Sequence, residues 1–358
     1  MENVKIIGMV WYYKEDFENI KKIFLDGINL GNNYNDWLKK AEKGYEYLSS
    51  RNYLVEKVYI NSITFPQWCK KHGCDLNSAS RTRFANEIVY KKYIEKKQFA
   101  SLCPIFLSHR YKKCMEQIGT GVLFSTSQFN FLLTAAHIID QMEFGDFFIP
   151  GKTSLENIIG TYSYLKIPEN KLRKDDKIDI GYFKLENIFF ERLNESLCPI
   201  KLKDIIFIDD ATKSIIYTIA GYPVSKSKIK SNYAASKQFY YSGYSITKEV
   251  YNQYGYNPTE HIIAGFRRNM SVTNEGNKIF PPFPRGMSGG GIYVWPEDLL
   301  GQIIPPNRKI VGIFHTYKEK DEVLIGTNIK EFIKCILINN PNLGLTEEEI
   351  EILEREIK

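Results

Sequence analysis

Apolar residues in the first hundred positions alternate between the close spacing of strands and the wider spacing of helices. The runs from Lys5 to Tyr13 and from Tyr53 to Ile60 predict two strands. Helix-like segments follow each strand: residues 14–25 and 36–50 after the first, and residues 65–72 and 78–97 after the second. This order predicts a small α/β domain over residues 1–98, with its two strands paired in parallel.

Local signals mark the ends of these helices. Asn35 is the expected N-cap of the helix over residues 36–50, and Thr64 is the expected N-cap of the short helix that follows the second strand. Gly73 fits the C-terminal end of that short helix, and Asn77 or Ser78 opens the long one.

Beyond residue 98 the apolar positions form short strand-like runs separated by turns, among them Gly119–Phe124, Asn130–Asp140 and Lys177–Leu185. The sequence Thr346-Glu347-Glu348-Glu349 is a capping box that opens a last, acidic helix. We therefore expect an α+β protein overall. An all-β domain spans residues 99–340, and a C-terminal acidic helix lies within residues 341–358.

Charge is unevenly distributed along the chain. The 48 Lys and Arg residues against 42 Asp and Glu give a net charge of +6, and residues 1–100 carry +5 of it (17 basic minus 12 acidic). The long helix holds six of these cations: Arg81, Arg83, Lys91, Lys92, Lys96 and Lys97. A solvated helix face explains them better than a nucleic-acid surface, because no aromatic stacking series or glycine-rich phosphate loop accompanies them. We expect no nucleic-acid partner.

Membrane and metal chemistry find little support in the sequence. No apolar run approaches the ~18–20 residues that cross a bilayer, and the N-terminus lacks the features of a signal peptide, so we expect a cytoplasmic protein. Cys69 and Cys74 flank His72, but no second ligand pair follows at zinc spacing. We expect reduced thiols, no metal and no cofactor.

The clearest chemical signal is the stretch Pro284-Arg285-Gly286-Met287-Ser288-Gly289-Gly290-Gly291, in which glycines surround one hydroxyl. A nucleophilic serine needs neighbours without bulk and backbone N–H groups free to point at a developing oxyanion. Gly286 can adopt backbone angles that a Cβ would forbid. Taken alone, the stretch fits a plain glycine turn equally well.

Two other segments supply partners for such a serine. His137 follows small residues at the end of an apolar strand, which leaves room for the imidazole. Asp179 heads a largely apolar strand, so its carboxylate is expected to be buried and to need a hydrogen-bond donor. Asp175 and Asp176 follow Arg173-Lys174 in a polar turn and are expected to be solvated.

With His137, Asp179 and Ser288 in this order, the chain resembles the trypsin/chymotrypsin-like serine proteases, in particular their single-chain intracellular bacterial members. The resemblance covers residues 100–340 and is carried by five motifs: Gly119-Thr120-Gly121, Leu133-Thr134-Ala135-Ala136-His137, Asp179-Ile180-Gly181-Tyr182-Phe183, Gly286-Met287-Ser288-Gly289-Gly290 and Val311-Gly312-Ile313-Phe314. It implies two six-stranded antiparallel barrels, with His137 and Asp179 in the first and Ser288 in the second. The N–H groups of Gly286 and Ser288 would form the oxyanion hole, without a cofactor.

One residue departs from the secreted members of that family. They carry an aspartate before the serine, which pairs with a newly cut N-terminus, whereas this chain has Met287. Activation by N-terminal clipping is therefore not expected. Insertions between Asp179 and Ser288, notably the tyrosine-rich residues 238–256, are expected to form hairpins over the cleft.

Phe314, His315 and Tyr317 are the candidates for the substrate pocket. Glutamate-cleaving relatives place a histidine two residues after the strand glycine, whereas His315 follows Gly312 by three. Because strand side chains alternate, His315 is expected to point away from the pocket and lie beside Asp179, with a pocket role as the alternative. An apolar, shallow pocket favours cleavage after small or medium uncharged residues, unless Asp321 or Glu322 reaches into it.

Three functions compete at this point. The first is an intracellular serine endopeptidase acting on proteins or peptides. The second is a catalytically silent scaffold that binds peptides, and the third is a basic binding module with the protease domain as an accessory. In the first two, residues 1–98 would recognise substrates or bind a regulatory protein.

Overall fold

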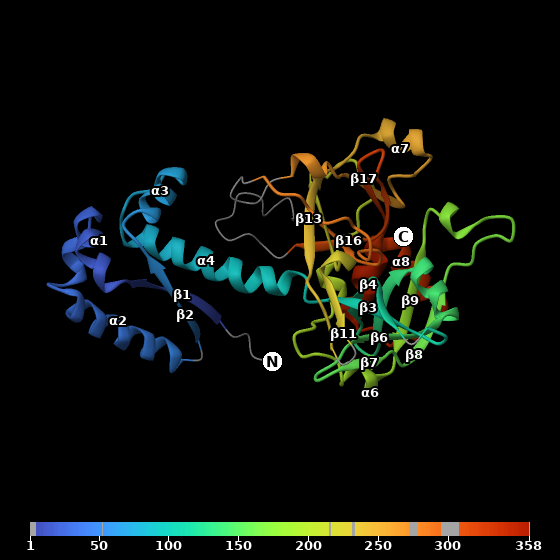
Figure 1. The fold of residues 1–358 in the computed structure, drawn as a ribbon, viewed down its shortest axis with the longest axis horizontal. Helices are drawn as coiled ribbons and strands as arrows, with labels where there is room; N and C mark the ends of the chain where they lie inside the picture. The colour runs from blue at the N-terminus through green and yellow to red at the C-terminus, as the bar shows by residue number, and fades with distance from the viewer. Residues whose placement is uncertain are drawn as a thin grey trace. The chain divides into compact units, whose positions relative to one another are not determined.

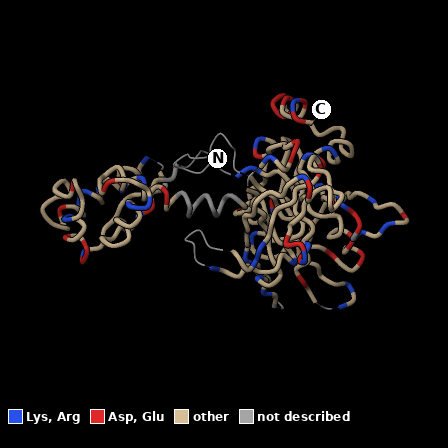
Figure 2. Tube along the Cα trace, turned by 90° about the horizontal axis from the view of Figure 1, so that it is seen from above, with Lys and Arg blue, Asp and Glu red and all other residues tan. Residues whose placement is uncertain are grey.

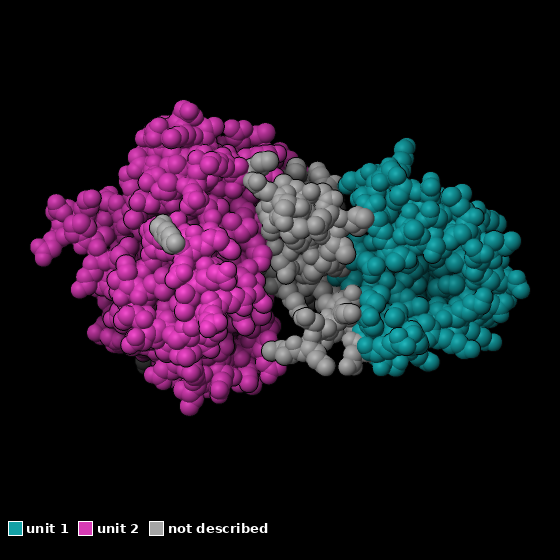
Figure 3. All heavy atoms as spheres, turned by 180° about the vertical axis from the view of Figure 1, so that it is seen from behind, with its two compact units in different colours: residues 1–97, 301–305 teal, residues 98–300, 306–358 magenta. Residues whose placement is uncertain are grey.

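The computed structural model describes residues 5–51, 53–112, 114–214, 216–230, 233–271, 278–294 and 308–357. They divide into two compact units, with the boundary between residues 97 and 98 (Figure 3). Each unit is treated by itself below.

The first unit is an α/β structure, as its apolar pattern predicts (Figure 1). Strands β1 (Lys5–Tyr12) and β2 (Tyr53–Ile60) pair in parallel from Lys5↔Tyr53 to Tyr12↔Ile60. The helices are α1 (Phe17–Ile23), α2 (Tyr34–Ser49), α3 (Thr64–Lys71) and α4 (Ser78–Gln98), with short 3-10 turns at Lys14–Asp16 and Gly27–Leu30. Aromatic rings fill much of the core, including an edge-to-face pair of Trp11 and Trp37.

Two of the predicted helix caps are wrong. The side chain of Asn33, not Asn35, accepts the N–H of Asp36 at the start of α2. At α3 the Asn61 side chain accepts the N–H groups of Ile63 and Thr64, so Thr64 is the first helical residue and not the cap. Both errors arise because several polar residues stand near each helix start, and only the folded backbone selects among them. Gly73, in the left-handed region with φ +58°, follows α3 as predicted.

The cations of α4 serve different purposes. Arg81 is buried and donates to both carboxylate oxygens of Asp26, at 2.6 and 2.8 Å. The guanidinium of Arg83 lies 5.6 Å from the centre of the Trp68 ring. The side chains of Lys91, Lys92, Lys96 and Lys97 lie outside the described residues. Arg81 therefore belongs to the interior of the unit and not to a solvated basic face.

The second unit contains two large antiparallel sheets (Figure 1). The first sheet has the order β7-β6-β3-β4-β5-β9-β8. Its strands are β3 (Leu102–His109), β4 (Met115–Ser125), β5 (Asn130–Ala135), β6 (Gly145–Pro150), β7 (Leu155–Asn157), β8 (Gly160–Tyr164) and β9 (Ile180–Leu185). The second sheet has the order β13-β10-β15-β16-β17-β14. Its strands are β10 (Ile216–Gly221), β13 (Phe239–Tyr244), β14 (His261–Gly265), β15 (Gly291–Val294), β16 (Lys309–Lys318) and β17 (Val323–Asn328).

Both sheets repeat one topology. When the edge strand β7 is set aside and the other strands of each sheet are numbered in chain order, both sheets show the cyclic order 1-2-3-6-5-4. The first sheet is open between β6 and β8, and the second between β13 and β14, where the bridge Ser245↔Ala264 spans the gap. The predicted pair of antiparallel barrels is thus confirmed as two curled half-barrels of the chymotrypsin-like kind.

The tyrosine-rich residues 238–256 do not form a hairpin over a cleft, contrary to the prediction. Their first part is β13, which pairs with β10 inside the second sheet, and their second part is helix α7 (Lys248–Tyr254). A separate hairpin, β11 (Ser227–Lys230) with β12 (Tyr233–Ser236), comes from the preceding segment. A tyrosine-rich segment fits a half-buried sheet strand as well as an exposed hairpin, which explains the error.

The second unit also contains helices besides α7. They are α5 (Ala136–Ile139), α6 (Asn187–Phe190), α8 (Ile329–Asn339) and α9 (Glu347–Glu356). Thr346 and Glu349 form the predicted capping box of α9, whose acidic positions are coloured red along the trace near the C-terminus in Figure 2. Leu353 of α9 and Ile333 of α8 pack into a core that contains residues of both sheets. Among the described residues no helix is long and apolar enough to cross a bilayer.

Candidate active site

His137 lies where β5 passes into the single helical turn α5. The strand residues Phe131, Leu132 and Leu133 are fully buried, and Ala135 keeps extended backbone angles before the turn begins. The small residues Ala135 and Ala136 leave the imidazole unobstructed, and about a third of the His137 side chain (34%) is exposed. The imidazole can therefore meet an incoming substrate.

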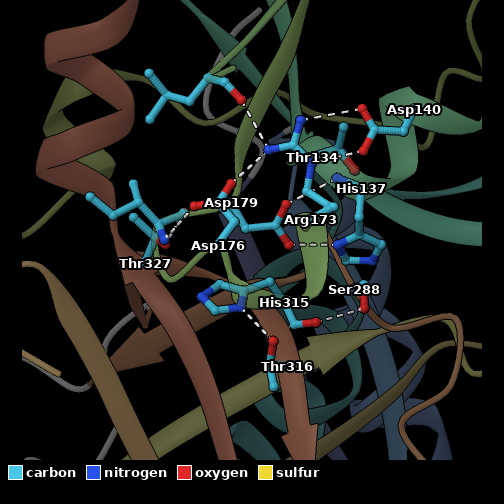
Figure 4. Close-up of polar contacts among 12 residues, drawn as sticks. Thr134, His137, Asp140, Arg173, Asp176, Asp179, Ser288, His315, Thr316 and Thr327 are labelled. Atoms are coloured by element: carbon cyan, nitrogen blue, oxygen red, sulfur yellow. Dashed lines mark hydrogen bonds and ion pairs between the residues drawn. The ribbon is translucent and has the colours of Figure 1, made fainter. Parts of the chain in front are cut away.

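Asp179 is buried and holds His137 through two hydrogen bonds (Figure 4). Its Oδ2 lies 2.5 Å from His137 Nδ1, and its Oδ1 accepts the His137 backbone N–H at 2.9 Å. Burial opposes ionisation of this carboxyl, but the hydrogen bonds and charge of His137 outweigh it and lower the pKa of Asp179. An ionised Asp179 accepts a hydrogen bond from the Nδ1–H group of His137, which leaves His137 Nε2 as the proton acceptor.

His315 lies beside this pair and is buried, with 5% of its surface exposed. A β-bulge in β16 makes it the extra residue between Phe314 and Thr316, so simple alternation does not set its direction. Its Nδ1 is 2.8 Å from the Thr316 hydroxyl. Burial lowers the pKa of His315 to about 4, although the charge of Asp179 acts in the opposite direction, so the ring is neutral near pH 7.

Ser288 sits in a loop held by its own backbone. Met287 N–H donates to Pro284 O, Gly290 N–H donates to Met287 O, and Gly289 N–H donates to Phe314 O, at 2.8, 2.8 and 2.7 Å. The Ser288 hydroxyl donates to the carbonyl oxygen of His315 at 3.0 Å and not to His137 (Figure 4). A rotation about the Cα–Cβ bond would redirect it.

Thr120 of β4 links the Ser288 loop to the first sheet, a role that was not predicted from the sequence. Its N–H donates to Ser288 O at 2.8 Å and its hydroxyl to Gly286 O at 2.9 Å. Thr134, three residues before His137, donates its hydroxyl to Thr120 O at 2.9 Å. The serine loop is thereby tied to the strand that ends at His137. The only sequence feature that could have indicated this role is the position of the threonine between two glycines.

The loop also presents two backbone donors. Gly286 has φ +87° and Gly289 has φ +86°, which are left-handed conformations that a side chain disfavours. Within the described part of the chain, the N–H groups of Gly286 and Ser288 have no hydrogen-bond acceptor, whereas those of Met287, Gly289 and Gly290 do. These two N–H groups can bind an oxyanion.

Met287 anchors this loop by apolar packing. Its side chain is 2% exposed and lies in the core of the second sheet with Ile219 and Ile292. The position before the serine is therefore filled by a thioether in an apolar environment, and it carries no charge.

A pocket of about 470 Å³ opens next to Ser288. Phe314 and Tyr317 line it, whereas His315 is not among its lining residues; the others are Phe283, Pro284, Arg285, Ser288 and Glu319. Neither Asp321 nor Glu322 lines the pocket. Glu322 Oε2 instead lies 3.9 Å from Arg267 Nε. The carboxylate that lines the pocket is that of Glu319, and it is opposite in charge to Arg285. Neither residue was predicted from the sequence to line the pocket.

Asp176 differs from the expectation that it is solvated. Its side chain is largely buried and pairs with Arg173, whereas Asp175 is exposed as expected. The preceding Arg173-Lys174 indicates a polar turn, but in the structure the arginine lies against the acidic side chains of Asp140 and Asp176.

Among the described residues, no group of three or more His, Cys, Asp or Glu side chains is arranged to hold a metal ion. The six cysteines are free.

Many solved structures are similar to this chain, among them the following three proteases. Neuropsin, a serine protease expressed in the limbic system of mouse brain, matches with 15% identity and a TM-score of 0.43 over 67% of this chain and 94% of its own. A Glu endopeptidase in complex with MPD matches with 13% identity and a TM-score of 0.40 over 68% and 92%. The VesB protease of Vibrio cholerae matches with 16% identity and a TM-score of 0.40 over 69% and 65%.

No protein-family model matches the chain, and no curated protein matches it in sequence. At the identities and scores of the three structures, neither activity nor substrate transfers to this chain. Its function has to be inferred from the geometry of the site.

Proposed function

We propose that this chain is a serine endopeptidase that uses His137, Asp179 and Ser288. The observation that carries the proposal is the pair of hydrogen bonds from His137 to Asp179, which orient the imidazole and leave its Nε2 able to accept a proton. The loop with Ser288 is tied to the same strand end through Thr120 and Thr134.

The chemistry follows from these positions. The Ser288 hydroxyl turns from the His315 carbonyl toward His137 Nε2 and attacks the scissile carbonyl carbon while the imidazole takes its proton. The N–H groups of Gly286 and Ser288 bind the resulting oxyanion, and removal of one such donor typically costs about 3–4 kcal/mol of transition-state stabilisation. His137 then protonates the leaving amine, and water completes the hydrolysis by the reverse route.

Labelling with a fluorophosphonate tests the proposal directly, because only an activated serine reacts. We expect the full-length wild type to be labelled, Ser288→Ala not to be labelled, and His137→Ala to react far more slowly. Ser196→Ala, which removes an exposed hydroxyl outside the site, is the matched control and should be labelled like the wild type.

The alternative is a silent scaffold that binds peptides, and one observation favours it: the Ser288 hydroxyl donates to His315 O and not to His137. A wild type that binds unstructured peptides but is neither labelled nor active on any of them would support the scaffold and refute the peptidase.

For the substrate, we propose peptides with an uncharged residue before the scissile bond. Phe314 and Tyr317 wall the pocket, and Arg285 and Glu319 of opposite sign give no net preference for either charge. The volume of about 470 Å³ also admits large apolar side chains, beyond the small and medium ones expected from sequence. Profiling with a peptide library decides this: a dominant preference for Arg, Lys or Glu would contradict it.

The N-terminal unit is proposed to recognise substrates or to bind a regulatory protein. This role, a cytoplasmic location and a bacterial origin stay predictions from the sequence.

A further inference from the structure

Two separate connections join the segment of His137 to the segment of Asp179. The direct one is the hydrogen-bond pair between these residues, supported by the Ala136 N–H, which donates to Asp179 O at 3.1 Å. The second connection runs through Arg173, which comes from the loop between β8 and β9.

Arg173 binds one carboxylate on each side (Figure 4). Its Nε and Nη2 donate to Asp140 at 2.7 and 3.3 Å, and its Nη1 donates to Asp176 at 2.7 Å. Asp140 follows His137 by three residues, and Asp176 precedes Asp179 by three. The guanidinium thus bridges the same two segments that the catalytic pair joins.

The bridge is partly buried. The side chains of Arg173, Asp176 and Asp140 are 16%, 13% and 34% exposed. Burial alone would lower the pKa of Arg173, but its hydrogen bonds to Asp140 and Asp176 raise it, so the guanidinium stays charged. Nη1 also donates to Leu165 O at 3.0 Å, which holds the start of the loop against its end.

Asp179 needs external support because of its backbone. Its φ of +43° lies in the left-handed region, which disfavours a residue with a Cβ. Asp176 stabilises the approach to this turn, since its Oδ1 accepts the Ile178 N–H at 3.1 Å while its Oδ2 faces Arg173. Without Arg173, the Asp176 carboxylate would lose its ion pair. The turn that directs the Asp179 carboxylate toward His137 would then be less constrained.

We propose that Arg173 is a positioning residue: by bridging Asp140 and Asp176 it holds the Asp179 carboxylate in register with His137. The proposal rests on the peptidase function proposed above. Its effect is geometric, because the guanidinium donates to Asp140, Asp176 and the carbonyl oxygen of Leu165 and not to His137 or Asp179.

Arg173→Met, made in the full chain, removes the bridge and keeps most of the side-chain volume. We expect kcat to fall on the order of 100-fold, as for a catalytic group displaced by about 1 Å, with KM little changed. Arg173→Lys should recover part of the loss, because an ammonium keeps the charge but not the planar fork. Arg192→Met is the matched control: Arg192 pairs with Glu156 at 3.6 Å, is half-exposed, and its loss should leave kcat unchanged.

A combination with Asp179→Asn separates positioning from a loss of stability. Because Arg173 acts through Asp179, adding Arg173→Met to Asp179→Asn should lower kcat little further. Full multiplication of the two effects would overturn the proposal. Should Arg173→Met fail to fold, Asp140→Asn removes the charge from the link to the His137 segment and keeps one acceptor oxygen, so it should lower kcat in the same direction but by less.

A second readout does not depend on activity. The proton on His137 Nδ1, shared with Asp179, gives a low-field NMR resonance that Asp179→Asn should abolish and that Arg173→Met should weaken or broaden by exchange. If the wild type is inactive but the resonance depends on Arg173, the peptidase function fails and the bridge stands. If Arg173→Met leaves both kcat and the resonance unchanged, the bridge is refuted and the peptidase function is not.

Discussion

The two half-barrels share a strand order, but they build their halves of the site by different means. The first half-barrel holds His137 through a side-chain hydrogen bond with the buried Asp179. The hydrogen bonds of Arg173 with Asp140 and Asp176 join the segments that carry these two residues. The second holds Ser288 with backbone hydrogen bonds, left-handed glycines and the apolar anchor Met287.

The difference reflects what each half has to do. In the proposed mechanism His137 changes its protonation state, and an ionised carboxylate beside it would both orient the ring and stabilise the imidazolium. In the same mechanism Ser288 and the oxyanion donors need exact placement and no charge, which a tightly hydrogen-bonded loop would supply. The first half should therefore respond to changes of charge, and the second to changes of shape.

The largest effect should come from removing the charge at Asp179. Asp179→Asn is isosteric, so the fold should be kept, but the wrong His137 tautomer should lower kcat by about 10⁴-fold. Steady-state kinetics, with circular dichroism to check the fold, measures this. Asp175→Asn, in the same loop but exposed, is the control. If Asp176→Asn were the more damaging change, the assignment of Asp179 as the acid would be wrong.

Adding a side chain at Gly289 should lower activity by changing the shape of the Ser288 loop. A Cβ here would collide with Thr120 O and the Thr134 hydroxyl, and the φ of +86° adds strain. Gly289→Ala should shift the Ser288 loop and lower kcat on the order of 10²–10³-fold, the range seen when an oxyanion donor is lost. Gly73→Ala is the control, because Gly73 also has a positive φ but its added Cβ meets no atom within 4 Å. Equal kcat for Gly289→Ala and wild type would remove the loop from the mechanism.

The anchor of the second half can be tested by adding a charge to it. Met287→Asp places a carboxylate in the apolar core of the second sheet, and we expect the free energy of unfolding to fall by at least about 3 kcal/mol. Met287→Leu keeps the volume and should cost less than about 1.5 kcal/mol. Denaturant unfolding of both variants gives the comparison, and a fully stable Met287→Asp would show that this position is not sealed from water.

The smallest predicted effect is a dependence of stability on pH at the junction of the two halves. His315 has a pKa of about 4 in the folded protein against an ordinary value of 6.5, so between these values the unfolded chain binds the proton and the folded one does not. Stability should therefore fall as the pH drops from 6.5, by about 2 kcal/mol at pH 5. His315→Gln should lose this part of the slope in denaturant unfolding, and an unchanged slope would contradict the burial of a neutral ring.

Periodicity and short motifs were enough for the fold. The alternation of strand and helix spacing before residue 98 predicts the parallel pair β1–β2, and the short runs after it predict strands. The two antiparallel sheets were implied by the family resemblance that the motifs carry. The helix caps at Asn33 and Asn61 were missed, because neighbouring polar residues compete for one role and only the folded backbone decides between them.

For the site, the sequence by itself determined which residue types could do the chemistry, since His137, Asp179 and Ser288 each stand in a fitting local frame. Tertiary structure alone decided how they are held: the bulge that directs His315, the hydrogen bonds of Thr120 across the two sheets, and the arginine bridge between Asp140 and Asp176. The contacts of Arg173 with Asp140 and of Thr120 with Gly286 join residues 33 and 166 positions apart. Local spacing is blind to such pairs, because their distance is set only when the sheets curl and the loops close.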